Sequence, residues 1–325
     1  TLHIPQPLVK TSALHNPCVP EQGWPAERCS FTQKQLDEIS AIKQRHARTC
    51  LNPSASLRVN PSQSSCHDLL LTETLPGLVS ILIPFRDRVE LTKTCVHSLQ
   101  ANASDSVPFE IILIDNGSEE DCTKAWIQEI TQSTNIHCLR IDEPFNFSRL
   151  NNLARKVCNG DHLLFLNNDI EFLSPNVLNQ LLDPFAHPGT AAVGTRLLYP
   201  DRSIQHQGVV IIKGERRCVL EPGKHLHQPE VIDSLTPLKV QEEFSAASAA
   251  CPLVKADRFD AIGGFNEELA VVFNDVDLCL RLREAGGHIV VTPHPTIIHH
   301  ESVSRGKDLE GKAWARHQRE SGLLR

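Results

Sequence analysis

The sequence predicts an α/β protein with a mostly parallel central sheet flanked by helices. From Leu78 onward, short runs of residues are apolar on both faces, which is typical of strands that helices cover on each side. Segments with helical spacing separate these runs, and an alternation of strand and helix produces parallel strands. A parallel sheet binds ligands at the carboxyl ends of its strands. The residues that follow each strand are therefore the first candidates for function.

The expected elements of the first half alternate regularly. The four predicted strands lie at 79–83, 110–115, 136–141 and 162–167. The predicted helices between them lie near 89–101, 119–131 and 147–158. Ser118 is the expected N-cap of the second helix, because Asp121 follows it at the spacing of a capping pattern.

The second half predicts a smaller, mixed β region. Residues 191–211 contain two extended stretches joined by the turn signal YPDRS, and 219–240 has the prolines of a loop. Small residues at 246–250 lead into a strand and a short helix that ends at Gly263 and Gly264. These small side chains either admit another molecule or pack tightly inside the protein.

The last elements contain several polar residues. Residues 274–287 predict a helix with Asn274 as N-cap and Gly286 or Gly287 at its end. The helix dipole favours acidic residues in the first turn, so Asp277 has a structural explanation as well as a functional one. A strand, HIVVTP, then precedes the segment IIHHESVSRG.

The composition changes at about residue 76. Residues 1–76 are rich in Pro, Ser, Cys and His and contain one good helical pattern, near 32–48, so we treat them as an N-terminal extension of unknown role. Residues 77–306 form the expected main domain, and 307–325 the expected C-terminal helical tail. Because the sequence starts at Thr1 and contains no methionine, we expect either a longer native chain or replaced methionines.

Composition excludes several classes of function. A net charge of −7 argues against a broad nucleic-acid surface, so no nucleic-acid partner is expected. Eleven cysteines without a C-x-x-C pair predict scattered reduced thiols, and a zinc or metal-storage protein lacks its ligand spacing. No long apolar run and no signal-peptide pattern occur, so we expect a cytoplasmic protein, soluble or peripheral to a membrane.

Polar residues follow three of the predicted strands. Residues 84–87 follow the first strand, Asp115–Gly117 end the second and Asn167–Asp169 end the fourth. Asn, Asp and Gly are ordinary turn formers, but three such endings at one sheet edge favour a ligand site. Carboxylates, oxygen donors and the pair His299 and His300 suit Mg²⁺ or Mn²⁺, which usually holds phosphates. The sequence therefore predicts a nucleotide diphosphate bound with a divalent cation, although neither common phosphate loop is present.

Eight stretches in order give the sequence a specific resemblance to a known family. They are VSILIPFRDR, EIILIDNGS, EPFNFSRLNNLA, LLFLNNDIEFLSP, AVGTRLLYPDRSIQHQGVV, SAACPLVKADRFDAIGGFNE, NDVDLCLRLREAGG and HHESVSRG. From about residue 76 to 306 the chain resembles glycosyltransferase family 2, inverting enzymes with the Rossmann-like GT-A fold. It looks most like the bacterial branch that builds O-antigen and other surface polysaccharides, which includes rhamnosyltransferases.

The resemblance implies a role for each candidate residue. Asp275 matches the catalytic base, Asp169 the metal-binding acid, and His299 or else His300 a further metal ligand. The nucleotide-sugar site would include Pro84, Phe85, Arg86, Asp87, Asp115, Asn116, Asn151, Asn167 and Asn168. The acceptor side would include Ala249, Ala250, Gly264, Asn274 and Asp277. Two positions depart from the family pattern, because Asn167 and Asn274 stand where the family has acids.

The implied function is transfer of a sugar, with inversion, from a nucleoside-diphosphate sugar to a glycan hydroxyl. We expect a deoxythymidine or uridine diphosphate donor, a glycan or lipid-linked glycan acceptor, attachment at the inner face of the plasma membrane and further domains or subunits. One alternative is a nucleotidyltransferase that makes nucleotide sugars, but the PFRDRVEL stretch lacks the glycines that such an enzyme needs there. Another is a catalytically silent carbohydrate-binding module, which Asn167 and Asn274 keep open.

Overall fold

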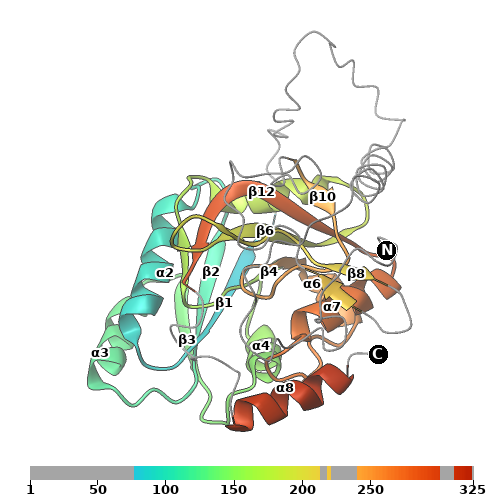
Figure 1. Ribbon diagram of the computed structural model, residues 1–325. Helices are drawn as coiled ribbons and strands as arrows, with labels where there is room; N and C mark the ends of the chain where they lie inside the picture. The colour runs from blue at the N-terminus through green and yellow to red at the C-terminus, as the bar shows by residue number, and fades with distance from the viewer. Residues whose placement is uncertain (1–76, 213–217, 221–239, 301–310, 324–325) are drawn as a thin grey trace.

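The computed structural model describes residues 77–212, 218–220, 240–300 and 311–323 (Figure 1). The expected N-terminal extension, its helix near 32–48 and most of the loop at 219–240 lie outside the described residues. In the part that is described, no helix is long and apolar enough to cross a bilayer.

The described strands form a ten-stranded sheet and a separate hairpin. Their bounds are β1 (Val79–Phe85), β2 (Phe109–Asp115), β3 (Ile136–Arg140), β4 (His162–Phe165), β5 (Ile170–Phe172), β6 (Thr190–Leu198), β7 (Ile204–His206), β8 (Val210–Ile212), β9 (Cys218–Leu220), β10 (Glu242–Glu243), β11 (Leu253–Lys255) and β12 (His288–His299). The main sheet runs in the order β10-β12-β6-β11-β4-β1-β2-β3, with β5 added to β12 and β7 to β6. The hairpin pairs β8 with β9.

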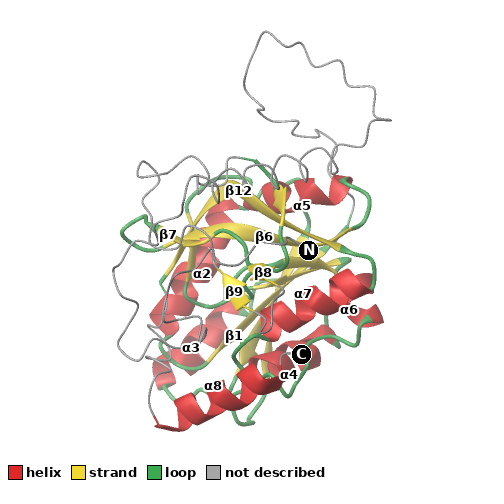
Figure 2. Cartoon of the chain, turned by 45° about the vertical axis from the view of Figure 1, so that its right-hand side comes forward, coloured by secondary structure: helices red, strands yellow, loops and turns green. Residues whose placement is uncertain are grey.

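Helices cover both faces of this sheet, as Figures 1 and 2 show. Their bounds are α2 (Val89–Asn102), α3 (Asp121–Ile130), α4 (Phe147–Arg155), α5 (Val177–Leu182), the 3-10 helix η2 (Asp183–Ala186), α6 (Ala256–Ala261), α7 (Asn274–Glu284) and α8 (Gly311–Leu323). One apolar core joins the sheet to α4, α6 and α7, and a second joins it to α2 and α5. The molecule is therefore a three-layer α/β/α structure, as the sequence predicts.

Strand β1 lies at the centre of the parallel half of the sheet. All seven of its residues are buried, and it pairs in parallel with both β2 and β4. Strand β3 continues the parallel order beyond β2. Because these four strands point the same way, their carboxyl ends meet at one edge of the sheet. The predicted polar strand endings therefore come together.

The other half of the sheet is mixed. Strand β11 is antiparallel to both of its neighbours, β4 and β6, whereas β6 and β12 are parallel. Strand β12 continues past Pro293 and Pro295 to His299, with a register shift between Thr292 and Ile297. The sequence predicts a shorter strand here, because proline removes a ladder hydrogen bond and is tolerated in a strand mainly at bulges and edges.

Two predicted helix caps are wrong. Helix α3 begins at Asp121 after Glu120, and the Ser118 hydroxyl instead accepts the backbone N–H of Asp87 at 2.9 Å. Helix α7 is preceded by Phe273, so Asn274 is its first helical residue. Ser118 lies in a loop that contacts a distant segment, whereas Asn274 is buried in the first turn of α7.

The predicted reduced thiols are confirmed for the part of the chain that is described. Six of its cysteines are free: Cys95, Cys122, Cys138, Cys158, Cys251 and Cys279. Burial raises the pKa of the Cys251 and Cys279 thiols to about 12, which keeps both protonated at neutral pH.

Candidate functional site

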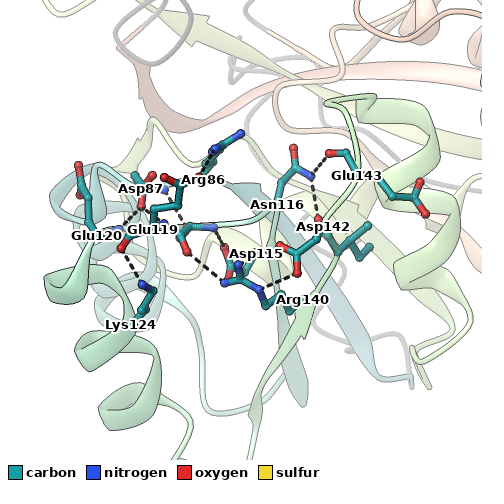
Figure 3. A network of polar contacts seen from close by, with 12 residues as sticks. Arg86, Asp87, Asp115, Asn116, Glu119, Glu120, Lys124, Arg140, Asp142 and Glu143 are labelled. Atoms are coloured by element: carbon teal, nitrogen blue, oxygen red, sulfur yellow. Dashed lines mark hydrogen bonds and ion pairs between the residues drawn. The ribbon is translucent and has the colours of Figure 1, made fainter.

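The loops after β1 and β2 are joined through Asp87 (Figure 3). The Asp87 carboxylate accepts the backbone N–H groups of Glu119 and Glu120 at 2.8 and 2.9 Å. Asp87 adopts φ = 51°, a left-handed conformation that aspartate tolerates better than most residues. The side chain thus holds together the two loops, which form the first corner of the candidate site.

Asp115 at the end of β2 is buried in a charged network, which Figure 3 also shows. One carboxylate oxygen accepts the N–H of Ser118 at 2.8 Å, and the other accepts a guanidinium N–H of Arg140 at 2.8 Å. Arg140 ends β3 and also pairs with Asp142 at 2.9 Å. The buried carboxylate is therefore both neutralised and oriented at the sheet edge.

The other candidate residues after β1 and β2 have different contacts at this sheet edge. The Asn116 amide donates to the carbonyls of Ile141 and Glu143, at 2.9 and 2.8 Å, and so holds the loop after β3. The Phe85 ring is buried edge-on against Trp126, with ring centroids 6.3 Å apart, and Pro84 is buried beside it. Arg86 is exposed and pairs with Glu119 at 3.1 Å. Of these side chains, the Arg86 guanidinium is the one that reaches solvent.

A second corner forms where β4 and β12 end. Asp169 is buried directly before β5, and its carboxylate oxygen lies 3.1 Å from Nε2 of His299. The antiparallel ladder between β5 and β12 places His299 opposite Ile170, and the N–H of His300 donates to the Asp169 carbonyl at 2.9 Å. Backbone pairing therefore brings the histidine to the aspartate.

The His299 ring is held in one orientation by Gln205. The Gln205 amide N–H donates to the His299 carbonyl at 3.3 Å, so its carbonyl oxygen is the atom that faces Nδ1 of the ring at 2.6 Å. A carbonyl oxygen only accepts hydrogen bonds, so Nδ1 carries a proton. In the neutral ring the lone pair is then on Nε2 and points toward Asp169.

The two adjacent histidines separate. Nε2 of His300 lies 3.0 Å from the Glu171 carboxylate, whereas His299 faces Asp169. Successive residues of an extended chain point to opposite sides, which explains the separation. The structure thus brings His299, and not His300, to Asp169.

The two asparagines before Asp169 also face different ways. The Asn167 amide nitrogen lies 3.4 Å from Nε2 of His299, so this side chain belongs to the same corner. Asn168 is buried and donates to the Thr92 hydroxyl of α2 at 3.1 Å. Asn168 therefore anchors the strand end to a helix.

The Asp169 corner fits a divalent cation that is shared with phosphates. A carboxylate oxygen and an imidazole nitrogen lone pair, both electron-rich, lie 3.1 Å apart in a mostly buried place. Within the described ranges, no group of three or more His, Cys, Asp or Glu side chains is placed to hold a metal ion. Two protein ligands suit Mg²⁺ or Mn²⁺, which take their remaining ligands from phosphate oxygens and water.

A third feature, the start of α7, contains Asp275. One carboxylate oxygen accepts the backbone N–H of Ala249 at 3.1 Å, and the other accepts the N–H of Val276 at 2.8 Å. The next residue, Ala250, accepts the N–H of Asn167 at 2.9 Å. The two-residue segment Ala249–Ala250 therefore contacts both Asp275 and the loop that contains Asp169.

The small residues at 246–250 pack inside the protein. A Cβ added to Gly194 of β6 would lie 2.3 Å from the Cβ of Ala247, and both Ala249 and Ala250 are buried. Of the two explanations that the sequence leaves open, tight internal packing holds.

Four further candidates are buried or have contacts within the protein. Asp277 pairs with Arg281 at 2.7 Å, and Arg281 donates to the Gly264 carbonyl at 2.7 Å. Gly264 has φ = 77°, and a Cβ there would lie 2.6 Å from the Asn152 side-chain oxygen. Asn151 is fully buried and donates to the Phe147 carbonyl within α4. Asn274 is also buried, in the first turn of α7.

Comparison with known proteins identifies the family of this site. The profile of "Glycosyl transferase family 2" matches residues 80–226, which include most of β1, the Asp115 network and Asp169, but not His299. The chain thus carries a family 2 glycosyltransferase domain. The residue pattern that resembles this family in the sequence is therefore confirmed.

Three bacterial proteins are relatives of this domain, and two of them are much longer than this chain. The chain is 39% identical to "Uncharacterized protein y4gI" of Sinorhizobium fredii over 88% of its own length and 31% of that protein. It is 35% identical to "O-antigen biosynthesis protein RfbC" of Myxococcus xanthus, over 71% of its length and 18% of that protein. It is 26% identical to "N-acetylglucosaminyl-diphospho-decaprenol L-rhamnosyltransferase" of Mycobacterium tuberculosis, over 65% and 73% of the two chains. The chain thus spans a third or less of the first two relatives.

Solved structures confirm the GT-A fold of the glycosyltransferase. A structure of GalNAc-T7 with UDP, GalNAc and Mn²⁺ matches 76% of this chain and 48% of that chain, with a TM-score of 0.58 and 15% identity. The mannosyltransferase PcManGT from Pyrobaculum calidifontis, with GDP-Man and Mn²⁺, matches 86% of this chain and 68% of that chain, with a TM-score of 0.55 and 13% identity.

Sequence reasoning missed three residues that contact these candidate residues or the segment before Ala249. Arg140 lies near the end of the predicted strand 136–141, and Gln205 and His206 lie in the second extended stretch predicted within 191–211. A polar residue within a predicted strand is the signal that was available. Nε2 of His206 accepts the N–H groups of Gly208 and Ser248, both at 3.1 Å, and so holds the segment before Ala249. Their partners are distant in the sequence, so no local pattern pairs them.

Proposed function

We propose that the domain is an inverting glycosyltransferase that moves a sugar from a nucleoside-diphosphate sugar to a glycan hydroxyl during synthesis of a bacterial surface polysaccharide. The observation that carries the proposal is that the segment Ala249–Ala250 contacts both Asp275 and the loop that contains Asp169. Asp169 beside His299 suits the diphosphate end of a donor, and Asp275 suits the attacking alcohol.

The chemistry follows from the two acids. In an inverting transfer the acceptor oxygen bonds to the anomeric carbon while the bond to the diphosphate oxygen breaks and its electron pair leaves with the diphosphate. The Asp275 carboxylate would accept the proton of the attacking hydroxyl. Mg²⁺ or Mn²⁺ held by Asp169 and His299 would neutralise charge on the departing diphosphate.

The nucleotide end of the donor is assigned to the first corner. Arg86 offers an exposed guanidinium there, and Asp115 offers a fixed carboxylate at the ends of β1 and β2. The relatives named for O-antigen synthesis and for rhamnosyl transfer support a deoxythymidine diphosphate sugar as the first donor to test, with uridine diphosphate sugars next. A glycan or lipid-linked acceptor would bring the enzyme to the inner face of the plasma membrane.

The first experiment separates the two acids. With Mn²⁺ present, binding of dTDP and UDP is measured by calorimetry, and turnover of dTDP-rhamnose and UDP sugars is measured for wild type, Asp169→Ala and Asp275→Asn. We expect Asp169→Ala to lose metal-dependent nucleotide binding together with turnover. We expect Asp275→Asn to keep binding and lose turnover by a factor on the order of 100 or more, the contribution typical of a general base.

The control is Glu284→Gln, which changes an exposed acid at the end of the same helix as Asp275. Unchanged metal-dependent binding in Asp169→Ala would reject the metal assignment. Full turnover in Asp275→Asn would reject the base assignment.

The buried state of Asn274 weakens the alternative of a silent binding module. That alternative depends on the replacement of family acids at positions 167 and 274, and the side chain at 274 is only 3% exposed. The half-buried carboxylate next to it, Asp275, is retained and oriented. An amide at position 274 therefore leaves the proposed base in place.

A further inference from the structure

A buried carboxylate of the C-terminal helix contacts the segment that leads to Asp275. Glu320 of α8 is fully buried, and its Oε2 accepts the backbone N–H groups of Val272 at 2.7 Å and Val271 at 3.1 Å. Its other oxygen lies 3.6 Å from the Arg319 guanidinium, beyond a normal hydrogen bond. A buried carboxylate is costly unless it is well bonded, so these two N–H contacts account for its place.

The contacted segment is short and strained. Val271 and Val272 precede Phe273, which has φ = 59°, a left-handed conformation that is unfavourable for a bulky residue. Asn274 and Asp275 follow immediately as the start of α7. A conformation of this kind persists only where surrounding contacts impose it.

Contacts from two helices hold the residues that precede Phe273. The carbonyls of Leu269 and Ala270 accept the Ser148 hydroxyl at 2.6 Å and the Phe147 N–H at 2.8 Å, both from the start of α4. Glu320 supplies the acceptor for the N–H groups that come next. Figures 1 and 2 both show α8 lying beside α4. The two helices therefore make hydrogen bonds to consecutive parts of the segment 269–272.

We propose that Glu320 is a positioning residue for Asp275, acting through the segment 271–273. The role of Asp275 as base rests on the proposed function, whereas the contact of Glu320 with Val271 and Val272 does not depend on it. Removal of the Glu320 carboxylate leaves two backbone N–H groups without their acceptor, which releases Phe273 from its strained conformation. Asp275 then loses the geometry that its bond to the Ala249 N–H defines.

The test compares Glu320→Ala with Glu320→Gln in the full 325-residue chain, with Gln318→Ala on the exposed side of α8 as control. We expect the amides of Val271 and Val272 to exchange with deuterium at least tenfold faster in Glu320→Ala, while the amides of β1 are unchanged. We expect kcat with Mn²⁺ and dTDP-rhamnose or UDP-N-acetylglucosamine to fall by a factor on the order of 100, as for a misplaced catalytic group, with KM for the donor nearly constant. Glutamine keeps an acceptor oxygen, so Glu320→Gln should recover most of kcat.

Unchanged exchange at Val271 and Val272 would overturn the proposal. Equal loss of kcat in the alanine and glutamine variants would also overturn it, as would a loss of Mn²⁺-dependent dTDP binding in parallel with kcat, because α8 would then act only as a general support. If the wild type turns over neither donor, the proposed function fails, and the exchange of the two amides still decides whether Glu320 holds the segment.

Discussion

Gln205 shows how one amide can determine what a histidine offers to a ligand. Its carbonyl oxygen accepts a hydrogen bond from Nδ1–H of His299, and its amide N–H donates to the His299 carbonyl. These two contacts leave Nε2 of the ring directed at Asp169. Partners of this kind orient metal-binding histidines in many proteins, and their loss commonly weakens metal binding by about 10–100-fold.

We therefore expect Gln205→Leu to weaken Mn²⁺ binding in the presence of dTDP by about 10–100-fold. Gln205→Glu keeps an acceptor for Nδ1 and should bind Mn²⁺ more tightly than Gln205→Leu. Titration of free Mn²⁺ by electron paramagnetic resonance measures both. Gln128→Leu, at an exposed position of α3, is the matched control. Wild-type Mn²⁺ affinity in Gln205→Leu would show that the ring needs no such partner.

Strand β6 packs directly against the segment 246–250, which contacts both Asp275 and the loop that contains Asp169. Gly194 lies against Ala247, and the segment continues through Ala249 and Ala250 to its contacts with Asp275 and Asn167. A methyl group at position 194 has no room, because the neighbouring Cβ would be 2.3 Å away. Tight packing here transmits any shift directly to the site.

Gly194→Ala should accordingly destabilise the fold by about 1–3 kcal/mol, the usual cost of overpacking a core. We expect turnover to fall as well, because the segment 246–250 must move away from β6. Urea unfolding gives the stability, and a donor hydrolysis assay gives the turnover. Gly322→Ala on α8 adds the same methyl group where nothing lies within 4 Å, so it should be near neutral. An equal effect of the two substitutions would contradict this packing argument.

The stability of the whole fold should decrease on acidification because of His162. This side chain begins β4, is buried against the Phe185 ring with centroids 4.9 Å apart, and has no hydrogen-bond partner at either ring nitrogen within the described part of the chain. Burial lowers the pKa of His162 below its usual value of 6.5, and the positive charge of Lys255 adds to the shift, while Asp161 and Asp257 oppose it.

The sign of the effect follows from the direction of this shift. In the unfolded chain His162 binds a proton near pH 6.5, whereas in the folded chain its pKa is lower. The contribution of His162 to the free energy of unfolding is therefore constant above pH 6.5 and decreases as pH falls below it. The decrease ends once pH is below the lowered pKa of the folded state. Urea midpoints measured from pH 7.5 to 5 should therefore fall more steeply for wild type than for His162→Phe. The same slope in both proteins would show that His162 is not the cause.

Several parts of the architecture were predictable from the sequence because they depend on neighbouring residues. Apolar runs and helical spacing report burial locally, and they locate β1 to β4 and helices α2 to α4 within a few residues. The parallel order of the strands then places Asp87, Asp115 and Asp169 at one edge. The place of Asp169 and its neighbours Asn167 and Asn168 at this edge could thus be predicted without coordinates, whereas the contact of Gln205 with His299 could not.

Other features were decided only when distant segments packed together. The ladder between β5 and β12 selects His299 over His300, and contacts from α4 and α8 hold the segment 269–272 ahead of Asp275. Arg140, Gln205 and Glu320 each act on a partner in another element. Periodicity along the chain reports which face of an element is buried, but it contains no information on which distant element covers that face. For that physical reason the sequence by itself places the acids at the ends of their strands and helix, and the tertiary structure decides their orientation and partners.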